Sequence, residues 1–190
     1  MGEVANCEVR RLALYLSEKY NIRVFAQMMT MLRGKLRNSK TFEFYDPGRL
    51  VDDDLTLVLY ETYPGDARRG YVPVYRFRMM RVGQKHEVGR IELRVSNINH
   101  IVMYAGHIGY RVLPLYRGRH YAARSCALLF PLAHRHSLNP LWITCNPDNY
   151  ASRRTCELAG ATLVEIIDLP EDVDMYQMGD LQKCRYRLDL

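Results

Sequence analysis

A basic, glycine-containing turn between a strand and a helix is the segment best suited to chemistry. Residues 107–112 have the pattern of a strand, Gly118 interrupts it, and apolar residues recur at helical spacing from Tyr121 onward. Such a turn presents free backbone N–H groups at the positive end of a helix dipole. Its basic side chains are Arg117, Arg119 and His120. The pattern predicts a phosphate cradle; the alternative is a turn that is merely basic.

The turn resembles the pyrophosphate loop of the GNAT superfamily of acyl-CoA-dependent N-acetyltransferases. That loop usually reads Arg or Gln, two residues, Gly, one residue, and then Gly or Ala. Arg117 and Ala122 match its ends. His120 stands where Gly is usual, and Gly118 lies two positions earlier.

A second segment strengthens the resemblance. Residues 146–152, reading NPDNYAS and followed by Cys156 and Gly160, are similar to the family's next motif, in which an Asn at a strand end leads into a short helix. The resemblance covers roughly residues 50–190 and is most specific between residues 104 and 161. It implies an acyl-CoA-binding domain.

The resemblance also implies which residues hold acetyl-CoA, the expected co-substrate. In the family, the end of the fourth strand splays from the fifth and its backbone pairs with pantetheine. By position, the strand residues are Tyr110, Arg111, Val112 and Leu113, and residues 141–145 form the partner strand. The phosphate loop comprises Arg117, Gly118, Arg119, His120, Tyr121, Ala122 and Ala123.

Acetyl transfer to an amine needs a proton acceptor for that amine. His107 lies on the fourth strand, where relatives often carry a Glu that is a candidate base, and imidazole with a pKa of ~6.5 suits this role. The alternative is a packed histidine bonded to a neighbouring carbonyl. Glu92, on the adjacent strand, is a weaker candidate for the base.

The transfer also needs an acid for the departing thiolate. Cys156 occupies the position where many relatives place a tyrosine thought to have this role; packing is the alternative. Asn149 is expected to hold pantetheine or a water, its alternative being a helix cap near Ser152. We expect no metal site, because His134 and His136 face different directions on a helix.

Alternating and helical patterns surround these residues. The predicted strands are residues 55–63, 74–82, 88–96, 103–113, 141–145, 161–168 and 184–190, with helices from residue 121 and over residues 151–159. Gly106 and Gly109 suggest a bulge or the close approach of a ligand. The order of elements predicts a mixed, mostly antiparallel α/β sheet with flanking helices.

The N-terminal region is predicted to be a helical extension over residues 1–40, before an acetyltransferase-like domain over residues 41–190. Apolar stripes in residues 8–19 and 24–36 would pack on the domain or form a dimer contact. This region carries eight Lys or Arg and three Glu, thus +5 of the net charge of +6. The interpretation as a nucleic-acid-binding protein rests on that charge alone. The preferred interpretation of the basic residues is a solvated helical face.

Composition narrows the class of protein. No apolar run approaches the ~18 residues of a membrane span, and no signal-peptide pattern is visible. The five cysteines are scattered, as expected of reduced thiols in a cytoplasmic protein. The sequence predicts an N-acetyltransferase that moves an acetyl group directly from acetyl-CoA to an amine of an unidentified acceptor. A non-catalytic CoA-binding or regulatory module is the alternative, and a homodimer is left open.

Overall fold

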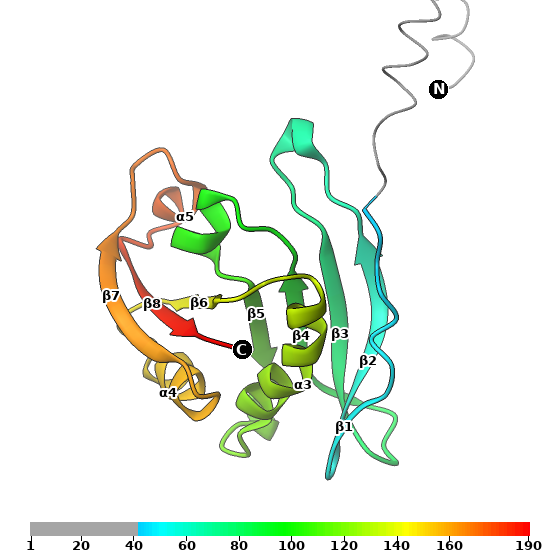
Figure 1. Cartoon of the computed structure of the whole chain (residues 1–190). Helices are drawn as coiled ribbons and strands as arrows, with labels where there is room; N and C mark the ends of the chain where they lie inside the picture. Colours follow the sequence, from blue (N-terminus) through cyan, green and yellow to red (C-terminus); the bar gives the residue numbers. More distant parts are fainter. Residues whose placement is uncertain (1–41) are drawn as a thin grey trace, which may run out of the picture. The chain divides into compact units, whose positions relative to one another are not determined.

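Two antiparallel sheets with helices against them make up the described part of the chain. The computed structural model describes residues 42–190, so the predicted N-terminal helices lie outside the described residues. One sheet has the strand order β1-β2-β3-β4-β5 and the other β6-β8-β7 (Figure 1). The predicted fold class, a mixed and mostly antiparallel α/β sheet with flanking helices, is confirmed.

The strands follow the predicted alternation closely. They are β1 (Leu50–Asp52), β2 (Leu55–Tyr63), β3 (Val74–Arg81), β4 (Glu87–Arg94), β5 (Ile108–Val112), β6 (Leu141–Cys145), β7 (Thr162–Asp168) and β8 (Gln182–Leu188). Strands β3 and β4 form the expected hairpin, and Gly83 in its turn has a φ of +76°. Strands β2 and β6 coincide with their predicted ranges because both are bounded by turn-forming residues.

Short and long helices connect these strands. They are the 3-10 turns η1 (Ala67–Arg69) and η3 (Pro114–Tyr116), the π-helical turn η2 (Ile101–Ala105), and the helices α3 (Tyr121–Arg135), α4 (Tyr150–Leu158) and α5 (Asp174–Gln177). Among residues 42–190, no helix is long and apolar enough to cross a membrane.

The prediction of a strand over residues 103–113 was wrong in its first half. Residues up to Ala105 form the π-helical turn, and Gly106 then has a φ of +70°. A Cβ on Gly106 would lie 2.9 Å from the backbone nitrogen of Thr144, so only glycine permits this approach to β6. Thr144 Oγ1 also donates a 2.8 Å hydrogen bond to the carbonyl of Tyr104. This contact with β6, which residue alternation does not encode, makes the strand begin later than predicted.

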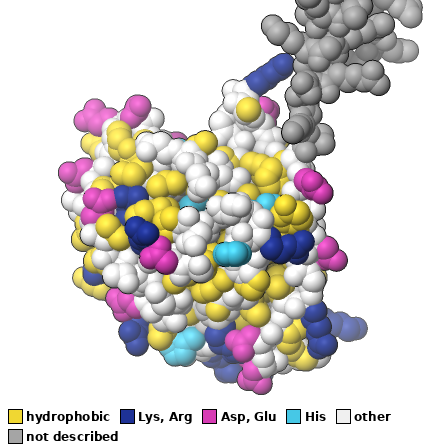
Figure 2. All heavy atoms as spheres, in the orientation of Figure 1, with side chains coloured by type: hydrophobic (Ala, Val, Ile, Leu, Met, Phe, Trp, Pro, Cys, Tyr) yellow, Lys and Arg dark blue, Asp and Glu magenta, His cyan; other side chains and the backbone are white. Residues whose placement is uncertain are grey.

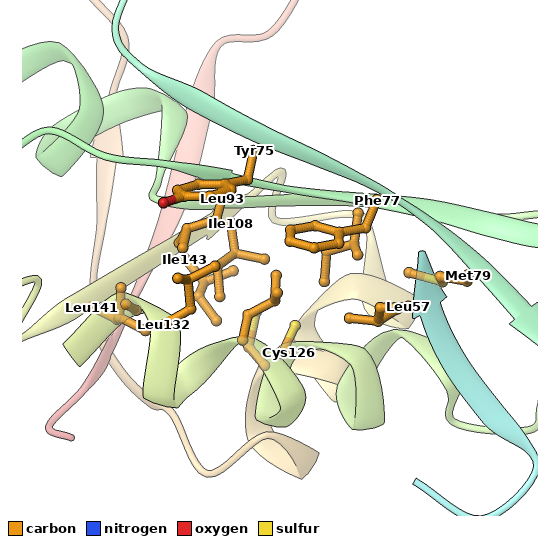
Figure 3. Packing of buried hydrophobic residues seen from close by; sticks show 14 of the residues in the cluster. Leu57, Tyr75, Phe77, Met79, Leu93, Ile108, Cys126, Leu132, Leu141 and Ile143 are labelled. Carbon is orange, nitrogen blue, oxygen red and sulfur yellow. The ribbon is translucent and has the colours of Figure 1, made fainter. Parts of the chain in front are cut away.

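The hydrophobic core lies between the first sheet and α3. Tyr75, Phe77 and Met79 alternate along β3 and point toward α3, which contributes Cys126 and Leu132 to the same cluster (Figure 3). Burial of a large apolar side chain contributes roughly 1.5–3 kcal/mol, so this layer fixes α3 on the sheet. On the face of the molecule seen in Figure 2, charged side chains of both signs are interspersed with hydrophobic ones.

Candidate active site

A cleft between β5, the start of α3 and α4 contains most of the predicted ligand-binding residues. It has a volume of about 560 Å³. Of the predicted residues it is lined by Tyr110, Arg111, Val112, Arg117, Gly118, His120, Tyr121, Ala122 and Asn149. Leu113, Arg119 and Ala123 do not line it.

The turn before α3 has the geometry of an anion site. Gly118 has a φ of +79° and His120 a φ of +56°, so the chain passes twice through the left-handed region before the helix starts. Within the described residues, no backbone or side-chain acceptor bonds the N–H groups of residues 118–123. These donors surround the positive end of the helix dipole, and the cleft therefore fits a diphosphate.

The conformation explains two features of the loop sequence. A Cβ on Gly118 would meet no atom within 4 Å, so the backbone angle, and not a protein neighbour, requires glycine there. His120 occupies the left-handed position at the helix N-cap, which is easier for glycine, and this accounts for the glycine that is usual in the family.

Strand β5 offers free backbone groups along one edge. It is the last strand of its sheet, and residues 107 and 113 bond β4 through Arg94 N–H→His107 O and Leu113 N–H→Val88 O. Because hydrogen bonds alternate along an antiparallel pair, Tyr110 directs its N–H and C=O away from β4. An extended chain carrying amide groups, such as pantetheine, can pair with this edge.

Helix α4 closes the other side of the cleft. The Oδ1 atom of Asn149 accepts a 3.0 Å hydrogen bond from the Ser152 N–H, so the predicted alternative of a helix cap is confirmed. Its amide NH₂ has no acceptor among the described residues, and Asn149 lines the cleft. Sequence reasoning missed several further lining residues of α4, whose helical spacing was the available signal: Ala151, Ser152, Arg154, Thr155 and Leu158.

The Tyr110 side chain reaches across to α4. Its Oη lies 2.7 Å from Ser152 Oγ and 3.8 Å from Cys156 Sγ. Burial raises the pKa of the Tyr110 phenol well above its usual range, so the phenol keeps its proton at neutral pH. Cys156 itself is fully buried and does not line the cleft. A hydrogen bond to Cys145, together with burial, raises the pKa of Cys156.

His107 joins the two sheets. Its N–H donates to the Trp142 carbonyl at 2.7 Å, and its Nδ1 accepts from the Trp142 N–H at 2.9 Å. The Nε2 atom lies 3.2 Å from Asn97 Oδ1, so both ring nitrogens have partners. The side chain is fully buried, and burial lowers its pKa to about 4. This geometry favours the structural alternative over the predicted role as a base.

Glu92 lies on the sheet face opposite α3, next to the edge strand. It pairs across the ladder with Gly109, and its carboxylate forms ion pairs with Arg94 and, at 3.5 Å, with Arg76. A Cβ on Gly109 would lie 2.8 Å from Arg94 Nη2 and 3.1 Å from Glu92 Oε1. The second glycine of the predicted strand therefore makes room for this ion pair.

Two further hollows continue from the cleft across that sheet face. The first, of about 370 Å³, shares Tyr110 and Arg111 with the cleft. The second, of about 600 Å³, shares Arg76, Glu92 and Arg94 with the first and extends to Asp174. Because β5 is an edge strand, a ligand in the cleft can meet one on the sheet face over that edge.

A free strand edge beside a helix N-terminus is an arrangement suited to an extended, phosphate-bearing ligand. A family model for the acetyltransferase (GNAT) domain matches residues 35–162. The chain belongs to the GNAT acetyltransferase family, as the sequence predicted. Enzymes of this family use acetyl-CoA as co-substrate. Among residues 42–190, no group of His, Cys, Asp or Glu could hold a metal ion.

Several solved acetyltransferase structures are similar to this chain at low sequence identity. A Vibrio cholerae protein, to which ribosomal-protein-serine acetyltransferase activity is ascribed, is 15% identical with a TM-score of 0.55, over 77% of this chain and all of its own. The Salmonella typhimurium acetyltransferase that modifies the N-terminal serine of ribosomal protein L7/L12 is 21% identical with a TM-score of 0.48, over 65% of this chain and 66% of its own.

The microcin C7 self-immunity acetyltransferase MccE, in complex with acetyl-CoA and AMP, is 16% identical with a TM-score of 0.48. The alignment covers 62% of this chain and 61% of MccE, so this chain spans less than two thirds of that protein. No curated protein matches the chain.

Proposed function

We propose that this protein transfers the acetyl group of acetyl-CoA directly to an amine bound on the sheet face that carries Glu92. The observation that carries this proposal is that each of the three hollows shares lining residues with the next. The cleft suits the phosphates and pantetheine, and it meets the sheet-face hollow at Tyr110 and Arg111. The thioester and the amine would then approach from opposite sides of the β5 edge, as direct transfer requires.

Glu92 is the residue best placed to receive the amine. Its side chain is 28% exposed and it lines both sheet-face hollows. Its two arginine partners leave lone pairs on the carboxylate that can accept an N–H of the acceptor. We therefore assign Glu92 the task of orienting the amine and taking its proton, directly or through water. His107 then has the structural task of joining the sheets.

Tyr110 supplies two further groups in this proposal. Its backbone N–H on the free edge of β5 is a donor for the oxyanion that develops on the thioester carbonyl. Its phenol, which retains its proton at neutral pH, is the acid for the departing thiolate. The phenol lies beside Cys156. In this proposal Tyr110, on β5, therefore has the role of acid that the sequence considered for Cys156, on α4.

The test is steady-state turnover of acetyl-CoA with a panel of amines. We expect Glu92→Gln to lower kcat/KM by ~10²-fold and to leave CoA affinity unchanged, because the carboxylate lies outside the cleft. Asp189→Asn, at an exposed ion pair with Arg187, is the matched control. Unchanged turnover in Glu92→Gln would remove this residue from the mechanism. If no amine accelerates acetyl-CoA consumption while CoA still binds, the alternative of a non-catalytic CoA-binding module is correct.

A further inference from the structure

Arginines outnumber carboxylates on the sheet face opposite α3. Strand alternation places five arginines there, Arg76, Arg78, Arg90, Arg94 and Arg111. The carboxylates that accompany them are Glu61, Glu87 and Glu92. Five positive and three negative charges leave an excess of two positive charges on this surface.

The few carboxylates are shared. Glu92 serves both Arg76 and Arg94, and Glu87 lies 3.0 Å from Arg90 and 3.8 Å from Arg78. Arg111 has no ion pair among the described residues. Guanidinium groups can bind carboxylates or phosphates in bidentate fashion, so this face retains unused capacity for an anion.

The excess is greatest in the 370 Å³ hollow. Four arginines and one carboxylate line it, a surplus of three positive charges: Arg76, Arg90, Arg94, Arg111 and Glu92. Tyr60 also lines the hollow, and the guanidinium carbon of Arg90 lies 5.7 Å from the centre of its ring. Stacking on an aromatic ring restricts a long side chain before a ligand arrives.

The ladder sets the distance from this anion site to Glu92. Arg90 pairs directly with Arg111, and Glu92 pairs with Gly109 two residues further along each strand. Two residues on one face of a strand are ~7 Å apart along the strand, at 3.2–3.4 Å per residue. The strand positions that carry Arg90 and Arg111 therefore lie about 7 Å from the position that carries Glu92, so an acceptor whose amine contacts Glu92 can reach these arginines.

We propose that the acceptor carries an anionic group, a carboxylate or a phosphate, a few bonds away from the amine that is acetylated. This inference rests on the proposed function, since it uses Glu92 as the position of the amine. Two sources share the required chemistry. One is a peptide N-terminus with Asp or Glu in its first three residues, and the other is a small amine that bears a phosphate. Both place an ammonium beside Glu92 and the anion between two guanidiniums.

The experiment measures kcat/KM for peptides that differ only in charge. The acidic peptide is Ala-Asp-Glu-Ala-amide and the neutral one Ala-Asn-Gln-Ala-amide, with 3-aminopropyl phosphate and propylamine as the small-molecule arm. We expect a preference of about tenfold or more for the anionic member of at least one pair, mostly through KM. Arg90→Gln should bring that ratio close to one, and Arg90→Glu should invert it. Arg187→Gln, an arginine on β8 outside the hollows, should keep it.

Several outcomes would overturn the inference. Equal kcat/KM values within both pairs would show that no anion is recognised, while acetylation of the neutral amines would leave the proposed function intact. A loss of CoA affinity in Arg90→Gln would show that the arginines serve the co-substrate instead. Binding of the fluorescein-labelled acidic peptide, measured by polarisation, gives a readout without turnover. Equal affinities of the wild type and Arg90→Gln for this peptide would also overturn the inference.

Discussion

Tyr121 Oη donates a 2.6 Å hydrogen bond to Asp54 Oδ2, which fastens the first turn of α3 to the turn between β1 and β2. Arg124 donates to the other oxygen of the same carboxylate at 2.9 Å, and Arg81 also contacts it. The hydrogen bonds from Tyr121 and Arg124 lower the pKa of Asp54 to about 2. Together with Asp52, which lies 2.6 Å from Arg124, Asp54 thus anchors the first turn of the helix whose N-terminus opens into the cleft.

We expect Asp54→Asn to weaken CoA binding several-fold, because the first turn of α3 loses a charged anchor. The free energy of unfolding should fall by about 1 kcal/mol, a modest value because the carboxylate is partly exposed. Thermal unfolding and calorimetry with CoA measure the two effects. Asp53→Asn, at a neighbouring residue with a φ of +50° that Asn tolerates, is the control. Equal CoA affinity in wild type and Asp54→Asn would contradict a positioning role.

The phosphate cradle predicts a difference between two isosteric side chains at Gly118. Gly118→Glu should abolish the stabilisation by CoA through repulsion of the diphosphate, and Ala122→Glu should do the same. Gly118→Gln should retain part of it. Both Gly118 variants carry the same cost of ~1–2 kcal/mol for a side chain at a φ of +79°, so the comparison isolates the charge. A wild-type thermal shift with CoA in Gly118→Glu would place the phosphate site elsewhere.

Tyr110 and Cys156 can be compared directly as proton donors. Tyr110→Phe removes only the phenolic hydroxyl, and we expect kcat to fall by ~10²-fold if this group protonates the thiolate. Cys156→Ala should change kcat little and instead lower the free energy of unfolding by roughly 1–2 kcal/mol, because the thiol is fully buried. The reverse pattern, a large rate effect in Cys156→Ala alone, would assign the acid to the cysteine, one of the two roles that the sequence left open for it.

Because His107 is buried, we expect the free energy of unfolding to depend on pH. Burial lowers its pKa to about 4, below the ~6.5 of the unfolded chain, so the unfolded state binds more protons between these values. Its contribution is present above pH 6.5 and is lost as the pH falls toward 4, by up to about 3 kcal/mol. Denaturant titrations at several pH values measure this slope.

The comparison variant is His107→Gln, which cannot titrate and should show a flatter pH dependence over the same interval. Its turnover at neutral pH separates the two interpretations of this residue. If turnover falls by ~10²-fold and the acidic limb of the rate profile disappears, His107 is the base. Retained turnover with an unchanged rate profile, alongside the flatter stability curve, would fit the structural role.

Several elements could be predicted from the sequence because their signals are local. Alternation and flanking turn residues predicted β2 and β6 at their observed bounds, and the helical pattern predicted the start of α3 at Tyr121. The phosphate loop was visible because a turn and a helix N-terminus depend on neighbouring residues only. Most of the predicted cofactor-binding residues therefore line one cleft.

The tertiary structure decided which side chains meet. The sequence pattern could place His107 on a strand. Only the approach of Trp142, 35 residues later, supplies hydrogen-bond partners for the His107 backbone N–H and for its ring Nδ1. Glu92 was the weaker candidate because its ladder partner Gly109, which leaves room for the ion pair with Arg94, lies 17 positions away. Strand register and the contact between the two sheets depend on pairs distant in the chain. Residue type and local spacing do not reveal such pairs. The sequence alone therefore determined the family and most of the residues that line the cleft, and the tertiary structure decided which side chains are neighbours there.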